Sequence, residues 1–235
     1  MQSNNSYYNV YDELNKYIQE FNNNNEIEFN IDTIRITFNK EHKLSYLKSL
    51  GKWHKLNKNC ENIKRKLNKR LDIDEVTSVY QLEKQNIYYY NSNKDKPKYR
   101  KAILVIFGLK QYHRKPPNNN LVKDIVNLLT YKNSKNECNI DICFDMSKKP
   151  KIDNLEIFFD LKRYFNKEKK ILTETYYIND TGVLMIDKVC IYNKALKNNL
   201  KRTLYRIEAT ISIPNLKALQ LPLNDFKTII DIVRG

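Results

Sequence analysis

The chain has 235 residues, with 42 lysine or arginine and 27 aspartate or glutamate side chains, and a formal net charge of +15 at pH 7. A positive field of this size attracts polyanions, of which nucleic acid is the best match. No apolar run approaches the roughly 18 residues of a membrane span, and the N-terminus lacks the regions of a signal peptide. We therefore expect a cytoplasmic protein with no membrane partner.

Hydrophobic periodicity predicts the first elements of the chain. A helix is expected over residues 7–22 and a strand over 26–39. The apolar phase of that strand changes at Asp32–Thr33, which predicts a bulge or a break. Residues 41–71 carry apolar side chains at three- and four-residue steps, which predicts a helical segment.

The outer face of the segment 41–71 is strongly basic. Such a face is either a solvated surface or a phosphate-binding surface, and the net charge of +15 gives weight to the second interpretation. The DNA-binding residues that this interpretation assigns to the segment are Lys52, Lys55, Lys64, Arg65, Lys66, Lys69 and Arg70.

The middle of the chain alternates strands with one short helix. Two short strands are expected within 76–92, followed by a strand over 98–109. The continuous apolar centre of the latter predicts burial on both faces. A helix follows over 121–131, capped by Asn119 or Asn120.

Two aspartates lie on the polar face of the strand predicted over 137–146. Asp141 and Asp145 are four residues apart, or roughly 13 Å along a strand, so at most one of them can ligate a given metal ion. Asp145, near the end of the strand, is the better metal ligand, and Asp141 could pair with a neighbouring cation. Both could also be ordinary surface aspartates.

The C-terminal third completes the expected fold. A helix over 151–166, strands over 171–178 and 183–187, a turn at 179–182, and short helices over 216–223 and 224–233 are expected. Together the elements predict one α+β domain, with a mostly antiparallel sheet and helices packed on one face.

Two period-2 runs within residues 188–213 predict paired strands joined by an exposed basic loop. Their shared polar face would carry Tyr192, Lys194, Arg206 and Glu208. A tyrosine beside cations and a carboxylate can act as a nucleophile on phosphorus. The alternative is a cross-strand ion-pair patch with a structural tyrosine. The basic residues of the loop, which we expect to bind DNA, are Lys197, Lys201 and Arg202.

Several segments occur in a recognisable order. They are Asp32-Thr-Ile-Arg-Ile-Thr-Phe, the apolar strand ending at Gly108, Asn139-Ile-Asp-Ile-Cys-Phe-Asp145, Ile191-Tyr-Asn-Lys194 and Tyr205-Arg-Ile-Glu208. This series, over roughly residues 26–213, resembles the replication initiation factor family of plasmid and phage rolling-circle initiators. The resemblance implies a replication-initiator-like fold and an enzyme that nicks one strand of a supercoiled origin. A tyrosine becomes joined to the 5′ phosphate, and a 3′ hydroxyl is released.

The resemblance also implies roles for individual residues. Tyr192 would be the nucleophile, with Tyr176 and Tyr177 as the alternatives, and Lys194 and Arg206 would neutralise the phosphate. The family needs a divalent metal, and Mg²⁺ or Mn²⁺ would be held by Asp145 and Glu208, supported by Asp141 or Asp32. The implied partner is a double-stranded DNA origin, with a host helicase or a second copy of the chain as further candidates.

The expected domain organisation has three parts. These are an N-terminal helix over 1–25, a nicking domain over 26–213 that includes the basic helical segment 41–71, and a C-terminal helical tail over 214–235. One alternative function is a non-catalytic DNA-binding replication initiator or regulator. Another is an RNA-binding or ribosome-associated basic protein.

Overall fold

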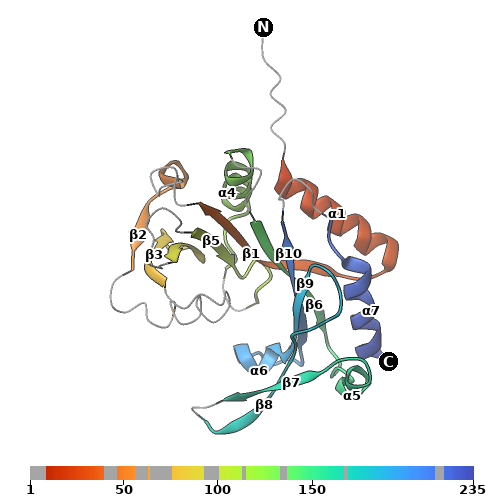
Figure 1. Ribbon diagram of the computed structural model, residues 1–235. Coiled ribbons are helices and arrows are strands. Elements are labelled where there is room, and N and C mark those ends of the chain that lie inside the picture. Colours follow the sequence, from red (N-terminus) through yellow and green to blue (C-terminus); the bar gives the residue numbers. More distant parts are fainter. Residues whose placement is uncertain are drawn as a thin grey trace.

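One large antiparallel sheet runs through the part of the chain that the computed structural model describes, which is residues 9–39, 47–56, 63, 76–92, 101–112, 115–132, 137–166, 169–214 and 220–235 (Figure 1). Its strands are β1 (Phe29–Asn39), β2 (Trp53–Lys55), β3 (Val76–Leu82), β4 (Ile87–Ser92), β5 (Lys101–Phe107), β6 (Glu137–Met146), β7 (Leu161–Asn166), β8 (Ile171–Ile178), β9 (Ile186–Asn193) and β10 (Tyr205–Ile213).

The strand order is β2-β3-β4-β5-β1-β6-β10-β9-β8-β7. Every neighbouring pair in this order is antiparallel. The sequence-distant strands β1, β6 and β10 therefore lie side by side at the centre, and the β7–β8 hairpin forms one edge. In Figure 1 this hairpin projects away from the helices α1 and α7.

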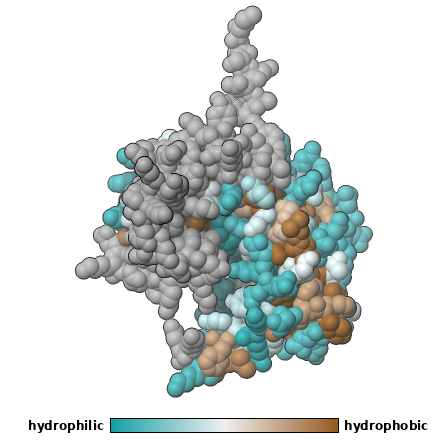
Figure 2. Space-filling model, in the orientation of Figure 1, coloured by the Kyte–Doolittle hydropathy of each residue, from teal (hydrophilic) through white to brown (hydrophobic). Residues whose placement is uncertain are grey.

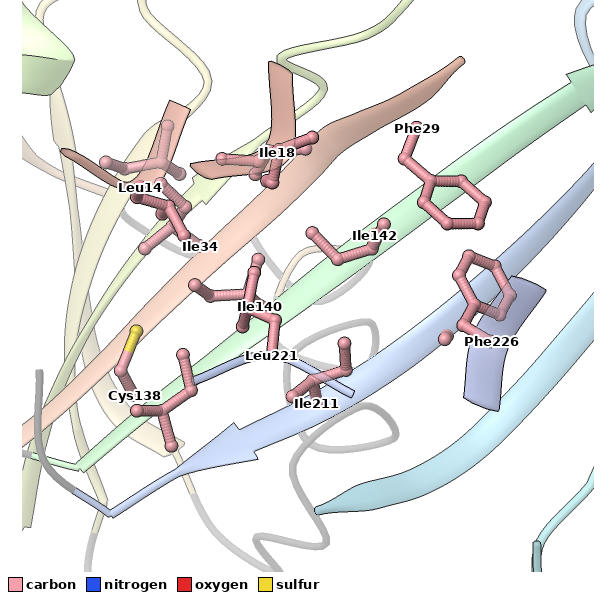
Figure 3. Packing of buried hydrophobic residues seen from close by; sticks show 14 of the residues in the cluster. Leu14, Ile18, Phe29, Ile34, Cys138, Ile140, Ile142, Ile211, Leu221 and Phe226 are labelled. Atoms are coloured by element: carbon pink, nitrogen blue, oxygen red, sulfur yellow. The ribbon is translucent and has the colours of Figure 1, made fainter. Parts of the chain in front are cut away.

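The helices cover one face of the sheet. They are α1 (Val10–Asn25), α4 (Asn119–Lys132), α5 (Ile152–Glu156) and α7 (Leu223–Arg234). Their apolar side chains form one buried cluster with the strands. Figure 3 shows Leu14 and Ile18 of α1 near Ile34 of β1, and Phe226 of α7 beside Phe29 at the other end of that strand. The expected α+β architecture with a mostly antiparallel sheet is confirmed.

The opposite face of the sheet is apolar at one end and polar at its centre. A second buried cluster covers β3–β5 and contains Val79, Tyr88, Tyr90, Ile103, Val105 and Phe107. Because Ala102, Leu104 and Ile106 of β5 belong to the first cluster, β5 is buried on both faces, as its sequence predicts. The polar centre of this open face, over β1, β6, β10 and β9, holds the candidate site.

The bulge predicted in β1 is present. Ile31 pairs with Ile142 and Thr33 pairs with Asp141, so Asp32 is an extra residue in the ladder. The side chain of Asp32 reaches Arg206 on the open face. The bulge thus moves a carboxylate into the site while Ile34 returns to the core.

Within the described residues of the range 41–71, Leu47 and Ile63 are helical as expected, but residues 48–56 do not form an α-helix. Residues Lys48–Leu50 form a single 3-10 turn, η1, which ends at Gly51 with a positive φ of 135°. Strand β2 comes next. It is stabilised by pairing with β3 and by the Trp53 indole, which donates to the Leu47 carbonyl. The predicted DNA-binding residues Lys64, Arg65, Lys66, Lys69 and Arg70 lie outside the described residues.

The helix expected over 151–166 is confirmed only in its first part. Only α5 is helical there, and residues Leu161–Asn166 form β7 instead. Pairing with β8 and a ring contact between Tyr164 and Tyr177 favour the strand. The spacing of apolar residues within one segment does not report contacts with another strand, so it could not predict β7.

Smaller differences concern element ends. Asn118, rather than Asn119 or Asn120, caps α4, because its side-chain oxygen accepts a hydrogen bond from the Leu121 amide. The basic loop after β9 begins with a short helix, α6 (Lys194–Asn198). Of the two C-terminal helices expected, the second corresponds to α7, and residues 216–219 of the first are outside the described part. No helix within the described ranges has both the length and the apolar character needed to cross a membrane.

The contact between α7 and β1 gives a stability prediction. Phe226 is fully buried, and its ring stacks on Phe29 with centroids 4.9 Å apart. We expect Phe226→Ala to lower the free energy of unfolding by about 3–5 kcal/mol, because it removes apolar contacts and leaves a cavity. Urea denaturation measures this change. The control is Leu184→Ala, whose side chain is 88% exposed and should change stability little; equal losses in both variants would contradict the assigned core.

Candidate active site

The strand register aligns polar side chains in rows across the open face. Asp145, Arg206 and Tyr192 stand directly opposite one another on β6, β10 and β9. Glu208 belongs to the next row, opposite Cys190. Because directly opposed residues share a face of the sheet, the tyrosine, arginine and glutamate that sequence alternation assigns to one face do meet there.

Arg206 lies at the centre of the site and is fully buried. Its Nε and Nη2 donate to the two Asp145 carboxylate oxygens at 2.6 and 2.7 Å. Its Nη1 donates to Asp32 at 2.8 Å and lies 3.7 Å from Glu208. Nη2 also donates to the Lys110 carbonyl at 2.8 Å. The guanidinium therefore has protein partners on all three nitrogens.

These contacts keep Arg206 and Asp145, the ion pair at the centre of the site, in their charged forms. Burial alone would lower the pKa of Arg206, but the hydrogen bonds to Asp145 and the charges of neighbouring groups, Asp32 among them, together raise that pKa. Burial would likewise raise the pKa of Asp145, yet the hydrogen bonds and charge of Arg206 leave it below its usual value. Both groups are ionised at neutral pH, so the buried positive charge of Arg206 is balanced by the Asp145 carboxylate to which it is hydrogen-bonded.

Tyr192 lies beside this centre, with its side chain almost completely buried. Its hydroxyl donates to Glu208 Oε1 at 2.6 Å, and the Lys194 ammonium lies 3.4 Å from the same hydroxyl oxygen. The Lys197 ammonium lies 4.2 Å from the centroid of the Tyr192 ring. A phenol, a carboxylate acceptor and two cations thus meet within one cluster.

Burial sets the protonation of these groups. It raises the pKa of Tyr192 well above its usual value, and the neighbouring Glu208 carboxylate adds to the effect. Burial also lowers the pKa of Lys194, and the Arg206 charge acts in the same direction. The Tyr192 hydroxyl is therefore protonated at neutral pH, and any chemistry at its oxygen requires a proton acceptor.

The Ile-Tyr-Asn-Lys segment places Lys194 through a helix cap. The Asn193 side chain accepts from the Leu196 amide at 2.8 Å and starts α6 at the end of β9. The Ala195 amide donates to the Leu204 carbonyl at 3.0 Å, which ties α6 to the start of β10. As a result Lys194 is buried at the first helical position, against Tyr192.

The segment after β5 forms one wall of the site, and sequence reasoning missed it. Gly108 adopts a left-handed φ of 69°, and the Leu109 amide donates to the Asp32 carbonyl. This turn brings the Tyr112 hydroxyl to Asp145 at 2.7 Å. Burial and the bond to Asp145 raise the pKa of Tyr112 to about 12. The sequence did contain one signal for this wall: a glycine comes directly after an apolar strand, and an aromatic residue follows soon after it.

Asp141 belongs to a separate ion pair. Arg35 Nη1 donates to one Asp141 oxygen at 2.9 Å, and Nη2 contacts the other. The Thr210 hydroxyl also donates to Asp141 at 2.8 Å. The pairing of Asp141 with a neighbouring cation is thus observed, but Asp141 does not join the Arg206 cluster. Arg35, which alternates with buried isoleucines in β1, was not assigned from the sequence.

The predicted DNA-binding residues that lie in the described part of the chain fall into two groups. Lys197 lies over the Tyr192 ring, and Arg202 Cζ lies 4.7 Å from the centroid of the exposed Tyr112 ring, so both stand at the rim of the site. Lys201 is exposed in the same loop. Lys52 and Lys55 are exposed at the β2 edge, seven strands from β9, or about 34 Å at the usual strand spacing.

The carboxylates do not have the arrangement of a divalent metal site. Both Asp145 oxygens accept hydrogen bonds from Arg206, and one of them also accepts from Tyr112. Asp32 and Glu208 face the same guanidinium, which stands where a shared cation would stand. Across the described ranges, no group of three or more His, Cys, Asp or Glu side chains could hold a metal ion. The expected Mg²⁺ or Mn²⁺ stays a prediction.

Comparisons with known proteins are sparse. No family model matches the chain, and no curated protein matches it. Among solved structures, the chain is similar to the rolling circle replication initiator protein from Geobacillus stearothermophilus, with a TM-score of 0.38 and 12% sequence identity, over 79% of this chain and 74% of the other. A similarity of this strength establishes neither a shared fold nor a shared activity.

The Arg206 cluster gives a prediction about metal binding. We expect Mg²⁺ to leave the thermal unfolding midpoint of the wild type unchanged, because the guanidinium already compensates the carboxylates. Arg206→Gln should lose about 3–5 kcal/mol of stability, since it leaves buried carboxylates without their cation. Mg²⁺ should restore part of that loss by occupying the vacated centre. Lys201→Gln, in the exposed loop, is the control. Clear stabilisation of the wild type by Mg²⁺ would show that a metal binds beside Arg206.

Proposed function

We propose that this protein is a DNA replication initiator of the rolling-circle type, in which Tyr192 nicks one strand through a covalent phosphotyrosine intermediate. The observation that carries the proposal is the hydrogen bond from the Tyr192 hydroxyl to Glu208, with Lys194 facing the same oxygen. The net charge of +15 makes DNA a suitable substrate. The rolling-circle assignment rests on the resemblance of the ordered sequence segments.

The proposed step is a transesterification. Glu208 accepts the hydroxyl proton as the Tyr192 oxygen forms a bond to phosphorus. The bond between phosphorus and the 3′ oxygen breaks, and that oxygen takes a proton from solvent to become a 3′ hydroxyl. One phosphodiester bond replaces another, so the strand can later be rejoined by the reverse step.

The surrounding cations would have different tasks. Lys194, at 3.4 Å from the Tyr192 oxygen, is placed to stabilise negative charge that develops on the phosphate. Lys197 and Arg202, at the rim, would guide the phosphate backbone. Arg206 was expected to contact the phosphate, but its nitrogens are occupied by Asp32, Asp145 and a carbonyl. We therefore assign Arg206 a positioning role.

A second candidate function is favoured by one specific observation. The Tyr192 side chain is only 4% exposed, so its hydroxyl is not directly open to a phosphate. In a non-catalytic DNA-binding initiator or regulator, Tyr192 would only join β9 to β10 through Glu208. Both candidates bind DNA with strong salt dependence, and they differ in whether a covalent adduct forms.

The nucleophile can be tested with labelled DNA. Wild-type protein is incubated with Mg²⁺ and a supercoiled replicon carrying its origin, or with a pool of randomised single-stranded oligonucleotides. On the oligonucleotides, which have ends to label, we expect a 3′ label to remain on the protein after denaturation, because the tyrosine holds the 5′ phosphate, and a 5′ label to leave on a shortened strand. On the supercoiled replicon we expect an open circle with the protein attached. Tyr192→Phe should abolish the adduct.

The control for this experiment is Tyr205→Phe, because Tyr205 alternates with Arg206 on β10 and lines a small pocket with Ile152 and Tyr176 on the helix-covered side. It should form the adduct at the wild-type level. Undiminished adduct from Tyr192→Phe would contradict the proposed nucleophile. Absence of adduct from the wild type, with salt-sensitive DNA binding retained, would favour the non-catalytic alternative.

Glu208 gives a separate prediction. Replacement by glutamine keeps the shape of the side chain but removes its capacity to take the Tyr192 proton. We expect Glu208→Gln to slow adduct formation by about 10²–10⁴-fold, the range typical of general-base removal. Oligonucleotide affinity, measured on the same preparation, should change far less. A rate within twofold of the wild type would exclude Glu208 as the proton acceptor.

A further inference from the structure

We propose that the β7–β8 hairpin holds the nucleic acid strand next to the cleaved phosphate, with Tyr177 and Tyr164 as a stacking platform and Lys162 as a phosphate contact. The proposal concerns single-stranded nucleic acid. It rests on the proposed function in one respect, that the strand to be cut passes Tyr192.

The strand register places the hairpin beside the site. Thr175 of β8 stands opposite Tyr192, and Tyr177 stands opposite Cys190 in the next row. Lys162 of β7 stands opposite Tyr177 and extends the same row outward. Tyr177 is thus one strand over and two residues along from Tyr192, an α-carbon separation of about 8 Å by standard strand geometry. A base attached near the cleaved phosphate falls within reach of this ring.

The same register separates the two tyrosines that were alternatives to Tyr192. Tyr176 stands opposite Ile191 and packs against the helix-side core. Tyr177, one residue further, faces the open side with Tyr192. Sequence reasoning treated both as possible nucleophiles, and their opposite faces now give them different environments. Only Tyr177 can meet a strand bound at the site.

The aromatic arrangement suits base stacking. The Tyr164 and Tyr177 rings are 6.4 Å apart and nearly perpendicular, at 82°. Both side chains are partly exposed rather than buried. Bases of single-stranded nucleic acid stack on such rings whatever their identity, because every base has a π-face. Paired bases within a duplex cannot do so, which is why we assign a single strand.

The charge of the hairpin matches a polyanion. Residues 161–172 contain five lysine or arginine residues and one glutamate. Lys162, Arg163, Lys169 and Lys170 are exposed. Figure 2 shows hydrophobic and hydrophilic side chains together at the lower end of the molecule, where the hairpin lies. Exposed cations interleaved with aromatic rings are the combination that single-strand binding surfaces use.

Binding of a labelled oligonucleotide tests the platform. The probe is a fluorescein-labelled single strand of mixed sequence, about ten nucleotides long, which spans one typical binding site. Fluorescence anisotropy is measured with the full chain in a Tyr192→Phe background, so that cleavage does not interfere. We expect Tyr177→Ala to raise Kd about tenfold, the usual cost of losing one stacked base. Tyr177→Phe, which keeps the ring, should restore most of the affinity.

Lys162→Gln provides an independent test if Tyr177→Ala does not fold. Losing one phosphate contact should reduce the slope of log affinity against log salt by about 0.7. The matched control is Lys16→Gln, since Lys16 is exposed on α1 at the helix-covered side. It should leave both the affinity and the slope unchanged.

The outcomes distinguish this inference from the nicking proposal. If folded Tyr177→Ala binds the single strand as tightly as its parent, the platform is overturned, even where the wild type forms the covalent adduct. If Tyr177→Ala loses affinity but the wild type forms no adduct, the platform stands and the nicking proposal fails. Loss of the adduct in Tyr177→Phe with a functional Tyr192 would make Tyr177 the nucleophile and overturn the platform. Tighter binding of duplex than of single strand would also overturn it.

Discussion

The buried guanidinium of Arg206 is the interaction on which the open face of the sheet depends. A charge removed from water is costly unless ion pairs and hydrogen bonds compensate it. Arg206 obtains its compensation from β1 through Asp32, from β6 through Asp145, and from the loop after β5 through a carbonyl. Removing it would leave carboxylates from several elements facing one another. The same contacts fix the row in which Glu208 meets Tyr192, so the charge that organises the fold also organises the candidate site.

The β1 bulge is what makes that arrangement possible. In a regular strand, side chains alternate between the two faces, and each polar residue on the open face is followed by an apolar one. The extra residue at Asp32 adds a carboxylate to the open face without moving Ile34 or Ile36 from the core. If the same residues ran without the bulge, regular alternation would turn Ile34 and Ile36 to the open face and expose that core. The single bulge at Asp32 therefore determines both which carboxylate enters the site and which side chains of β1 stay in the core.

Period-2 patterns in β6, β9 and β10 predicted which side chains share the open face, because alternation is a local property. The sequence could not reveal that Arg206 would pair with Asp145 and Asp32, because these two residues lie 61 and 174 positions away from it in the chain. Local spacing also misled over 151–166, where β7 forms because β8 is available to pair with it. Tyr112 was missed for a related reason: only the Gly108 turn, in three dimensions, brings its hydroxyl to Asp145.

In the proposed nicking reaction, burial of Tyr192 would have two opposed consequences. It raises the pKa of the hydroxyl, which makes Glu208 necessary as an acceptor, and it hides the oxygen from an approaching phosphate. The same burial would protect a phosphotyrosine from water, which a reversible strand transfer requires. Lys197 stands over the Tyr192 ring from an exposed position on the short helix α6. In the proposed nicking function, a phosphate drawn to Lys197 would compete with the Tyr192 ring for that ammonium, which would favour conformations in which Tyr192 is more exposed.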